Sequence, residues 1–289
     1  MAKDLYENNV KVQKQIDEAE DLLDFPLKDI CFEGPEKLLT QSQYTQPAIF
    51  VHSAIVDTLV KQKGLYPEAV AGHSLGEYSA LYSAGVLNFE DALNLVKIRG
   101  ALMQEAGEEN PGTMAAIIGL DSEKVVNLCN IASSVGIVKP ANFNSPGQIV
   151  ISGSVQGVER AMMLAKEAGA RIVKKLPVSG AFHSPLMEGA LGGLVDALEN
   201  APFDNPEVPV YTNVNAEPET NPEKLRLLAQ KGLLSPVRWE DIIKNMVKNG
   251  IHKSFELGPG KVLCGLNKRI DQEFECQSFD TQSDLEKLN

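Results

Sequence analysis

The stretch Gly72-His73-Ser74-Leu75-Gly76 places a hydroxyl between two glycines, after a short apolar run and before a segment with helical character. A serine at a sharp strand-to-helix turn is typical of a nucleophile elbow, whose strained backbone requires neighbours without side chains. We expect Gly72 and Gly76 to meet that requirement. Ser74 would then lie at a helix N-terminus, where free N–H groups favour developing negative charge. The alternative is an ordinary turn whose serine only caps the helix.

A second chemical signal is an arginine on an apolar helix face. Asn88 predicts a helix N-cap, and Arg99 falls in the middle of the apolar stripe that follows. The stripe consists of Ala92, Leu95, Val96, Leu102 and Met103. A guanidinium there costs several kcal/mol unless it meets an anion. Either a structural salt bridge or snorkelling satisfies it, or it binds a carboxylate ligand as a planar fork.

A third signal is His183, in the Gly/Ser/Pro-bounded loop Ser179–Pro185. Taken alone it fits a surface histidine, but it follows Ser74 in chain order, as the base does in α/β-hydrolases. The other histidines show no ligand spacing, so no metal site and no cofactor is predicted. The cysteines are scattered, which predicts reduced thiols. They are Cys31, Cys129, Cys264 and Cys276.

Composition limits the classes of function. The 289 residues are 43% hydrophobic and 23% charged, as expected for a globular protein with an ample core. A net charge of −12 argues against nucleic-acid or anionic-membrane binding. No signal sequence or apolar run of membrane-spanning length is present, so a cytoplasmic protein is expected.

Residues 113–180 predict a compact βαββαβ unit of the ferredoxin-like type. Its strands are expected at 113–119, 136–144, 148–153 and 171–178, and its helices at 122–134 and 154–169. Strands alternating with helices on both sides of this unit predict a mainly parallel, helix-covered sheet, as in α/β-hydrolases. We therefore expect an α/β fold in which residues 1–112 and 181–289 form a large domain and residues 113–180 an inserted subdomain.

The larger part has several further expected elements. Helices are expected at 9–23, 47–63 (with Pro47 opening the second), 186–200, 240–248 and 261–270, strands at 208–214 and 252–257, and a polar linker at 105–112. The glycine-rich turn at 258–260 lacks the spacing of a phosphate-binding loop.

The chain resembles the malonyl-CoA:acyl carrier protein transacylases of fatty-acid synthesis and the related acyltransferase domains of polyketide synthases. Matching motifs occur in the family's order over nearly the whole chain. They are Thr45-Gln46-Pro47-Ala48, Gly72–Tyr78, Arg99-Gly100 with Met103–Ala106, Asn142–Gln148, Ala181–Met187, Pro236-Val237-Arg238-Trp239 and Gly258–Leu263.

This resemblance implies roles for the three signals. Ser74 is expected to take the malonyl group as an ester, and His183 to act as its general base. Arg99 is expected to bind the malonyl carboxylate, and the N–H of Leu75 to stabilise the oxyanion. The substrates would be malonyl-CoA and acyl carrier protein, for fatty-acid or polyketide synthesis, with no cofactor and a monomer as the expected state.

Four further residues are implied by the same resemblance. The backbone carbonyl of Gly232 stands where the family usually has a glutamine whose carbonyl orients the histidine. Phe182 resembles the pattern of malonyl-selective members. His73 and Asn142 are expected to bind substrate.

The family also opens with a Gly-Gln-Gly-Ser-Gln-like segment that supplies a first strand and one oxyanion-hole N–H. That segment is not in this sequence, so we expect Leu75 to be the remaining donor. Loss of one such donor lowers turnover by roughly 10²–10³-fold.

Two other functions fit part of the pattern. A serine hydrolase would use Ser74 and His183 but needs no cation in its acyl pocket. A carrier-binding protein with impaired turnover would bind acyl carrier protein without becoming acylated.

Overall fold

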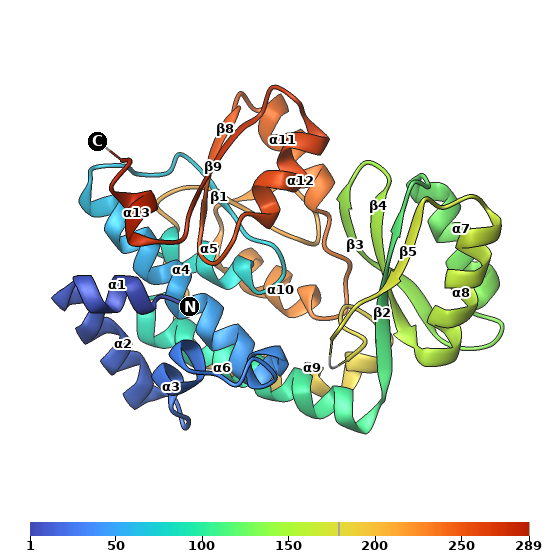
Figure 1. The fold of residues 1–289 in the computed structure, drawn as a ribbon, viewed down its shortest axis with the longest axis horizontal. Coiled ribbons are helices and arrows are strands. Elements are labelled where there is room, and N and C mark those ends of the chain that lie inside the picture. Colours follow the sequence, from blue (N-terminus) through green and yellow to red (C-terminus); the bar gives the residue numbers. More distant parts are fainter. Residues whose placement is uncertain (179, 289) are drawn as a thin grey trace.

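The computed structural model describes residues 1–178 and 180–288. Ser179, which opens the predicted return loop, and Asn289 lie outside the described residues. Figure 1 shows a larger, helix-rich part that holds both chain ends and, beside it, a smaller part built around a sheet.

The chain before the small sheet is mostly helical. Side-chain caps begin two of its longer helices: the side chain of Asn9 accepts from the N–H groups of Lys11 and Val12, and that of Asn88 from the N–H of Asp91. The elements are α1 (Lys3–Asn8), α2 (Val10–Leu22), α3 (Leu27–Phe32), η1 (Leu38–Thr40), α4 (Ser42–Gln62), β1 (Val70–Ala71), α5 (Gly76–Ser83) and α6 (Phe89–Glu109). None of the helices in the described chain combines the length and hydropathy needed to cross a bilayer.

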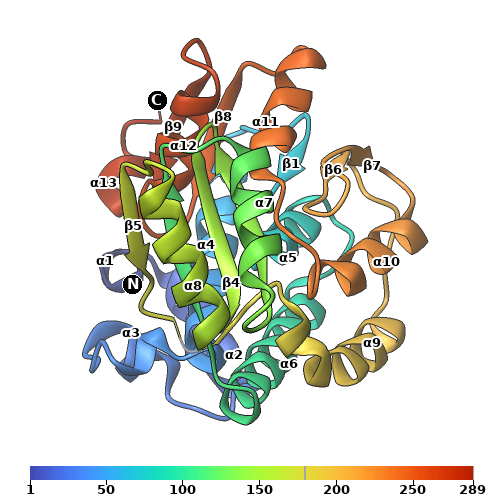
Figure 2. The same ribbon diagram turned by 90° about the vertical axis from the view of Figure 1, so that its right-hand side faces the viewer.

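The small sheet has four antiparallel strands in the order β3-β4-β2-β5. Its elements are β2 (Gly112–Ile118), α7 (Ser122–Ala132), β3 (Val138–Ser145), β4 (Gln148–Ser154), α8 (Val155–Glu167) and β5 (Ile172–Lys175). Figure 2 shows α7 and α8 side by side over one face of this sheet. This arrangement confirms the predicted ferredoxin-like βαββαβ order.

After the small sheet the chain returns to the larger part. The elements are η2 (Pro185–Ala190), α9 (Leu191–Asn200), β6 (Val210–Tyr211), β7 (Pro218–Glu219), α10 (Pro222–Gly232), α11 (Trp239–Lys248), β8 (Lys253–Leu257), α12 (Val262–Ile270), β9 (Glu275–Phe279) and α13 (Gln282–Leu285). Strand β1 pairs in parallel with β6, β7 joins β6 antiparallel, and β8 pairs in parallel with β9. The α/β class is confirmed, with the strands of the larger part in two small sheets.

The cores follow the same division. The largest core combines side chains from before and after the small sheet, including Phe50, Leu93, Leu194 and Phe279. The small sheet and its two helices enclose another core around Ile117, Ile149 and Ile151. On this basis we propose that residues 1–112 and 181–289 form one domain and residues 113–180 the inserted one.

Some predicted boundaries were wrong. Helix α4 begins at Ser42, so Pro47 lies inside the helix and does not open it. Residues 105–109, predicted as linker, continue α6, because Glu and Ala are strong helix formers. The strand expected at 208–214 is only Val210–Tyr211. Helix α10 and strand β9 were not predicted, although α10 is amphipathic and buries Leu225 and Ala229 on one face.

The prediction that all cysteines are reduced is also wrong. Cys264 of α12 and Cys276 of β9 form a disulfide across a sequence separation of 12. Tertiary packing of α12 against β9 brings the two sulfurs together, and sequence spacing carries no sign of it. Cys31 and Cys129 are free, and burial raises their pKa to about 11 and about 12.

Close packing of α6 against α4 positions Arg99. A Cβ at Gly100 would lie 2.7 Å from the backbone oxygen of Ser42, so the two helices approach at a point where α6 has no side chain. The next turn of α4 carries Gln46, whose Oε1 accepts a hydrogen bond from Arg99.

We predict that Gly100→Ala lowers the melting temperature, because the added methyl meets backbone and overpacking costs about 1–3 kcal/mol. The matched control is Gly265→Ala, also in a helix, where an added Cβ meets nothing within 4 Å. That variant should gain up to about 1 kcal/mol of helix propensity. Differential scanning calorimetry of both variants checks the prediction, and equal shifts would contradict it.

Candidate active site

The turn between β1 and α5 has the geometry of a nucleophile elbow. Ser74 has φ 53°, in the left-handed region that residues other than glycine seldom adopt. A Cβ at Gly72 would lie 1.8 Å from the backbone oxygen of Gly76, so the turn requires glycine there. A Cβ at Gly76 would meet nothing within 4 Å, and the expectation that both glycines are sterically required is wrong for Gly76.

His183 lies beside Ser74 although 109 residues separate them. Its Nε2 is 2.8 Å from Ser74 Oγ, and its Nδ1 is 3.0 Å from the carbonyl oxygens of both Gly232 and Ser235. Because a carbonyl only accepts, Nδ1 carries the proton and Nε2 presents its lone pair to the hydroxyl. The structure thus brings Gly232 to the predicted position and adds Ser235, which the sequence did not indicate.

Arg99 is 4% exposed, yet it makes no ion pair with a carboxylate among the described residues. One guanidinium nitrogen donates to Ser74 Oγ at 3.1 Å and the other terminal nitrogen donates to Gln46 Oε1. Its Cζ lies 5.5 Å from the centroid of the Tyr78 ring. The direct contacts of this cation are therefore neutral dipoles and an aromatic face, while Glu77 of the same pocket acts on it electrostatically without forming an ion pair.

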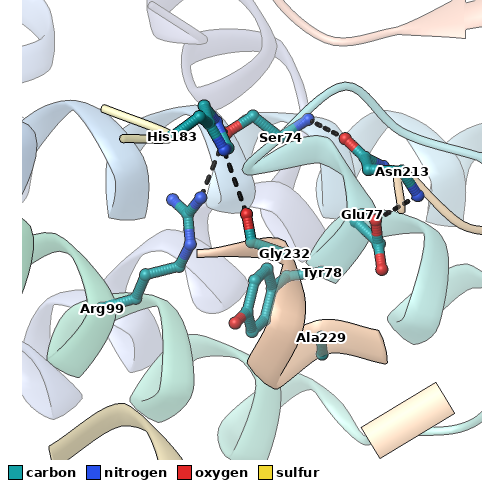
Figure 3. A pocket seen from close by; sticks show the side chains of 8 residues that line it. All are labelled: Ser74, Glu77, Tyr78, Arg99, His183, Asn213, Ala229 and Gly232. Carbon is teal, nitrogen blue, oxygen red and sulfur yellow. Dashed lines mark hydrogen bonds between the residues drawn. The ribbon is translucent and has the colours of Figure 1, made fainter. Parts of the chain in front are cut away.

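These side chains line one pocket, shown in Figure 3. Arg99 rises from α6 toward the paired Ser74 and His183, while Tyr78 lies below the Gly232 carbonyl. The lining residues are Ser74, Glu77, Tyr78, Arg99, His183, Asn213, Ala229 and Gly232.

Burial dominates the electrostatics of this pocket. Desolvation, and next the charge of Arg99, lower the pKa of His183 to about 3, so the imidazole is neutral at pH 7. Desolvation also raises the pKa of Glu77 to about 7 and that of Tyr78 to about 12. The pKa of Arg99 is lowered by burial, but a guanidinium remains charged at any working pH.

Three predicted substrate-binding residues lie next to this pocket without lining it. His73 Nε2 is 2.9 Å from Asn144 Oδ1 of β3, and burial lowers the pKa of His73. Asn142, also in β3, is buried and bridges to Val237 through the backbone. Phe182 packs on the apolar cluster at the base of the small sheet. The contact between His73 and Asn144 joins the small sheet to the elbow.

The N–H of Leu75 is the elbow group that remains open. The N–H of Ser74 donates to Asn213 Oδ1 at 2.7 Å, whereas no hydrogen bond from the N–H of Leu75 occurs within the described chain. Leu75 is the N-cap residue of α5, and backbone N–H groups at a helix start lack partners inside the helix.

Sequence reasoning missed Gln46, Glu77, Asn213 and Ser235. A signal existed for Asn213, which is a polar residue just past β6, the strand parallel to β1. Carboxyl ends of neighbouring parallel strands meet at one edge of a sheet, where binding residues gather. Gln46 and Ser235 depend on tertiary contacts with distant segments.

One group outside this pocket has metal-ligand chemistry. Donor atoms of Glu256, Cys264 and Cys276 lie within 4.8 Å of one another. The two sulfurs are bonded to each other, and both oxygens of Glu256 accept N–H groups, those of Leu263 and Cys264 at the start of α12. This set caps a helix, and we assign it no metal.

Comparisons with known proteins agree with this geometry. The family model described as acyl transferase domain matches residues 1–269. The malonyl CoA-acyl carrier protein transacylase of Haemophilus influenzae is 45% identical over 255 residues, covering 88% of this chain and 82% of that protein. The acyl carrier protein S-malonyltransferase from Vibrio cholerae superposes with a TM-score of 0.95 at 42% identity, covering 100% of this chain and 95% of that one.

A further solved structure is a malonyl-transacylase in complex with a type II PKS acyl-carrier protein. It gives a TM-score of 0.96 at 39% identity over 100% of this chain and 94% of that one. Fold and motifs together define an acyltransferase of the nucleophile-elbow type. The chain belongs to the acyl transferase domain family, which confirms the resemblance seen in its sequence.

We predict that Arg99→Gln raises the pKa of His183, because a cation that repels the imidazolium is removed. The protonated imidazole carries the positive charge. Removal of a nearby cation therefore favours the protonated form, and His183 loses its proton at a higher pH. NMR titration of the imidazole resonances measures this directly, and the chain has only four histidines to assign. Arg171→Gln, at an exposed arginine, is the control. An unchanged or lower pKa in Arg99→Gln would contradict the prediction.

Proposed function

We propose that this protein transfers a malonyl group from malonyl-CoA to the phosphopantetheine thiol of acyl carrier protein through a malonyl ester on Ser74. The observation that carries the proposal is the buried Arg99, whose guanidinium lies 3.1 Å from Ser74 Oγ without a carboxylate partner in the described chain. The names of its relatives support the same activity.

The position of Arg99 fits an acyl group with a free carboxylate at its far end. A buried cation is strongly unfavourable unless it meets an anion, so a malonyl carboxylate gains a charge-assisted, two-point contact there. An acetyl group leaves the guanidinium unpaired, and a site built for a polar group rejects the analogue lacking it.

His183 serves as the base in both halves of the reaction. Its Nε2 takes the Ser74 proton as Oγ attacks the thioester carbonyl, and gives it to the departing coenzyme A thiolate. It then removes the proton of the carrier thiol as that sulfur attacks the serine ester, and returns the proton to Ser74 Oγ when the ester bond breaks. The Gly232 and Ser235 carbonyls hold the ring and stabilise the transient imidazolium without accepting its proton.

We assign the developing oxyanion to the N–H of Leu75, since the N–H of Ser74 is already bonded to Asn213. His73 and Asn142 are proposed to support the substrate-binding face where the elbow meets β3. Phe182 is proposed to form one wall of the acyl pocket. A cytoplasmic location and a monomeric state stay predictions from the sequence.

A serine hydrolase explains Ser74 and His183 but gives no reason for Arg99. A hydrolase pocket gains nothing from a buried, unpaired cation, and the His183 carbonyl partners differ from the acidic third residue of hydrolase triads. Malonyl transfer accounts for all three residues.

The proposal predicts a covalent intermediate. After incubation with malonyl-CoA, peptide mass spectrometry should find the malonyl group on the peptide containing Ser74. Ser74→Ala should abolish it, while Ser79→Ala, in the helix that follows, should retain it. A malonyl group at another position, or none on the wild-type protein, would contradict the proposal.

Substrate choice supplies a second test. Arg99→Ala should reduce Ser74 malonylation by about 10²–10³-fold, as expected when one partner of a buried charge pair is lost. Acetylation from acetyl-CoA should fall far less, because acetyl makes no contact with the guanidinium. Arg171→Ala is the surface control. Equal losses for both acyl donors would exclude the carboxylate role.

A further inference from the structure

The elbow is held from outside by one buried amide. Asn213 follows β6 and is 3% exposed. Its Nδ2 donates to the carbonyl of Gly72 at 2.6 Å, and its Oδ1 accepts from the N–H of Ser74 at 2.7 Å. The side chain therefore satisfies a backbone acceptor and a backbone donor on the two sides of His73, within the turn itself.

Asn213 is held in turn by the helix that leaves the elbow. Its backbone N–H donates to Glu77 Oε2 at 2.8 Å, and Glu77 is 4% exposed on α5. Figure 3 shows the resulting chain of contacts from Ser74 through Asn213 to Glu77. The strand end, the turn and the helix start are thus connected by three hydrogen bonds through one residue.

The backbone conformation of Ser74 explains why these hydrogen bonds are needed. A serine with φ 53° persists only when its surroundings over-determine it. An amide carries a donor and an acceptor a fixed distance apart, which matches the Gly72 carbonyl and the Ser74 N–H. A carboxylate at the same place would turn an acceptor toward the Gly72 carbonyl.

We propose that Asn213 is a positioning residue for acyl transfer, which fixes Ser74 in its reactive conformation and is itself oriented by Glu77. The role deepens the proposed function and rests on it. By occupying the Ser74 N–H, Asn213 also leaves the N–H of Leu75 as the elbow's donor to the oxyanion.

The test compares Asn213→Asp and Asn213→Ala with the wild-type protein. Asn215→Ala is the matched control, because Asn215 bonds Thr212 and Glu217 in the same turn and does not bond the elbow. Two rates are measured: malonylation of Ser74 against malonyl-CoA concentration, and labelling of Ser74 by phenylmethylsulfonyl fluoride, a reagent that carries no carboxylate for Arg99.

At neutral pH, Asn213→Asp should lower the maximal malonylation rate by about 10²-fold, as for a misplaced reacting group, with KM changed by less than about threefold. Labelling should slow in parallel. As the pH falls, the new carboxyl gains a proton and becomes a donor and acceptor like the amide, so the rate relative to wild type should recover. Asn213→Ala should not recover.

Glu77, Arg99 and His183 face the same pocket and are present in each variant. Each rate is therefore expressed as the ratio of variant to wild type at one pH. Asn215→Ala should stay within about threefold of wild type at every pH, as expected for a position outside the reacting geometry.

If Asn213→Asp does not fold, Glu77 gives the second test. Glu77→Gln keeps an oxygen that accepts the Asn213 N–H and should label nearly as wild type, while Glu77→Leu removes the acceptor and should label more slowly. Equal labelling of these two variants would overturn the proposal.

Other outcomes also decide it. The positioning role is overturned if Asn213→Asp reacts at the wild-type rate. It is also overturned if the rates of Asn213→Asp and Asn213→Ala fall by the same factor at every pH. If wild-type protein is never malonylated but labelling slows in Asn213→Asp and recovers at low pH, the proposed function fails and the positioning of Ser74 stands.

Discussion

A guanidinium kept out of water beside a serine hydroxyl is the constraint on which the rest of this structure depends. Arg99 is surrounded by a glutamine oxygen, an aromatic ring and the hydroxyl of Ser74, all of them neutral. Such groups offset only part of the cost of burying a cation. We propose that a ligand anion supplies the missing part, because the buried guanidinium lies 3.1 Å from Ser74 Oγ and has no carboxylate partner in the described chain.

The buried charge of Arg99 also explains why His183 has neutral hydrogen-bond partners. His183 is oriented by the carbonyls of Gly232 and Ser235, and a carboxylate in their place would compete with the ligand for Arg99. The buried acid nearby, Glu77, has its pKa raised to about 7 by desolvation and is bonded to Asn213. Burial thus reduces the negative charge on Glu77, in the pocket where we propose that the acyl carboxylate binds.

Much of this site could be predicted from residue type and local pattern. Ser74 lies in a five-residue motif, Arg99 breaks an apolar stripe, and His183 lies in a loop whose place in the chain order fits a base. Their joint assignment came from the family resemblance, because no local pattern brings residues 74, 99 and 183 together. The fold followed similarly, since the βαββαβ unit has regular periodicity and clear turn residues.

The residues that were missed act through tertiary contacts. Gln46, Asn213 and Ser235 are ordinary polar residues until helix packing and parallel strand pairing bring them to the elbow. The disulfide between Cys264 and Cys276 has the same origin. Gly76 shows the converse, because its place in the motif indicated a steric need that the space around it does not impose.

The most direct test of the central claim is a crystal structure of the protein after reaction with malonyl-CoA. The account predicts a malonyl ester on Ser74 whose terminal carboxylate accepts two hydrogen bonds from the Arg99 guanidinium. A structure in which Arg99 instead pairs with the carboxylate of Glu77 and points away from the ester would contradict it.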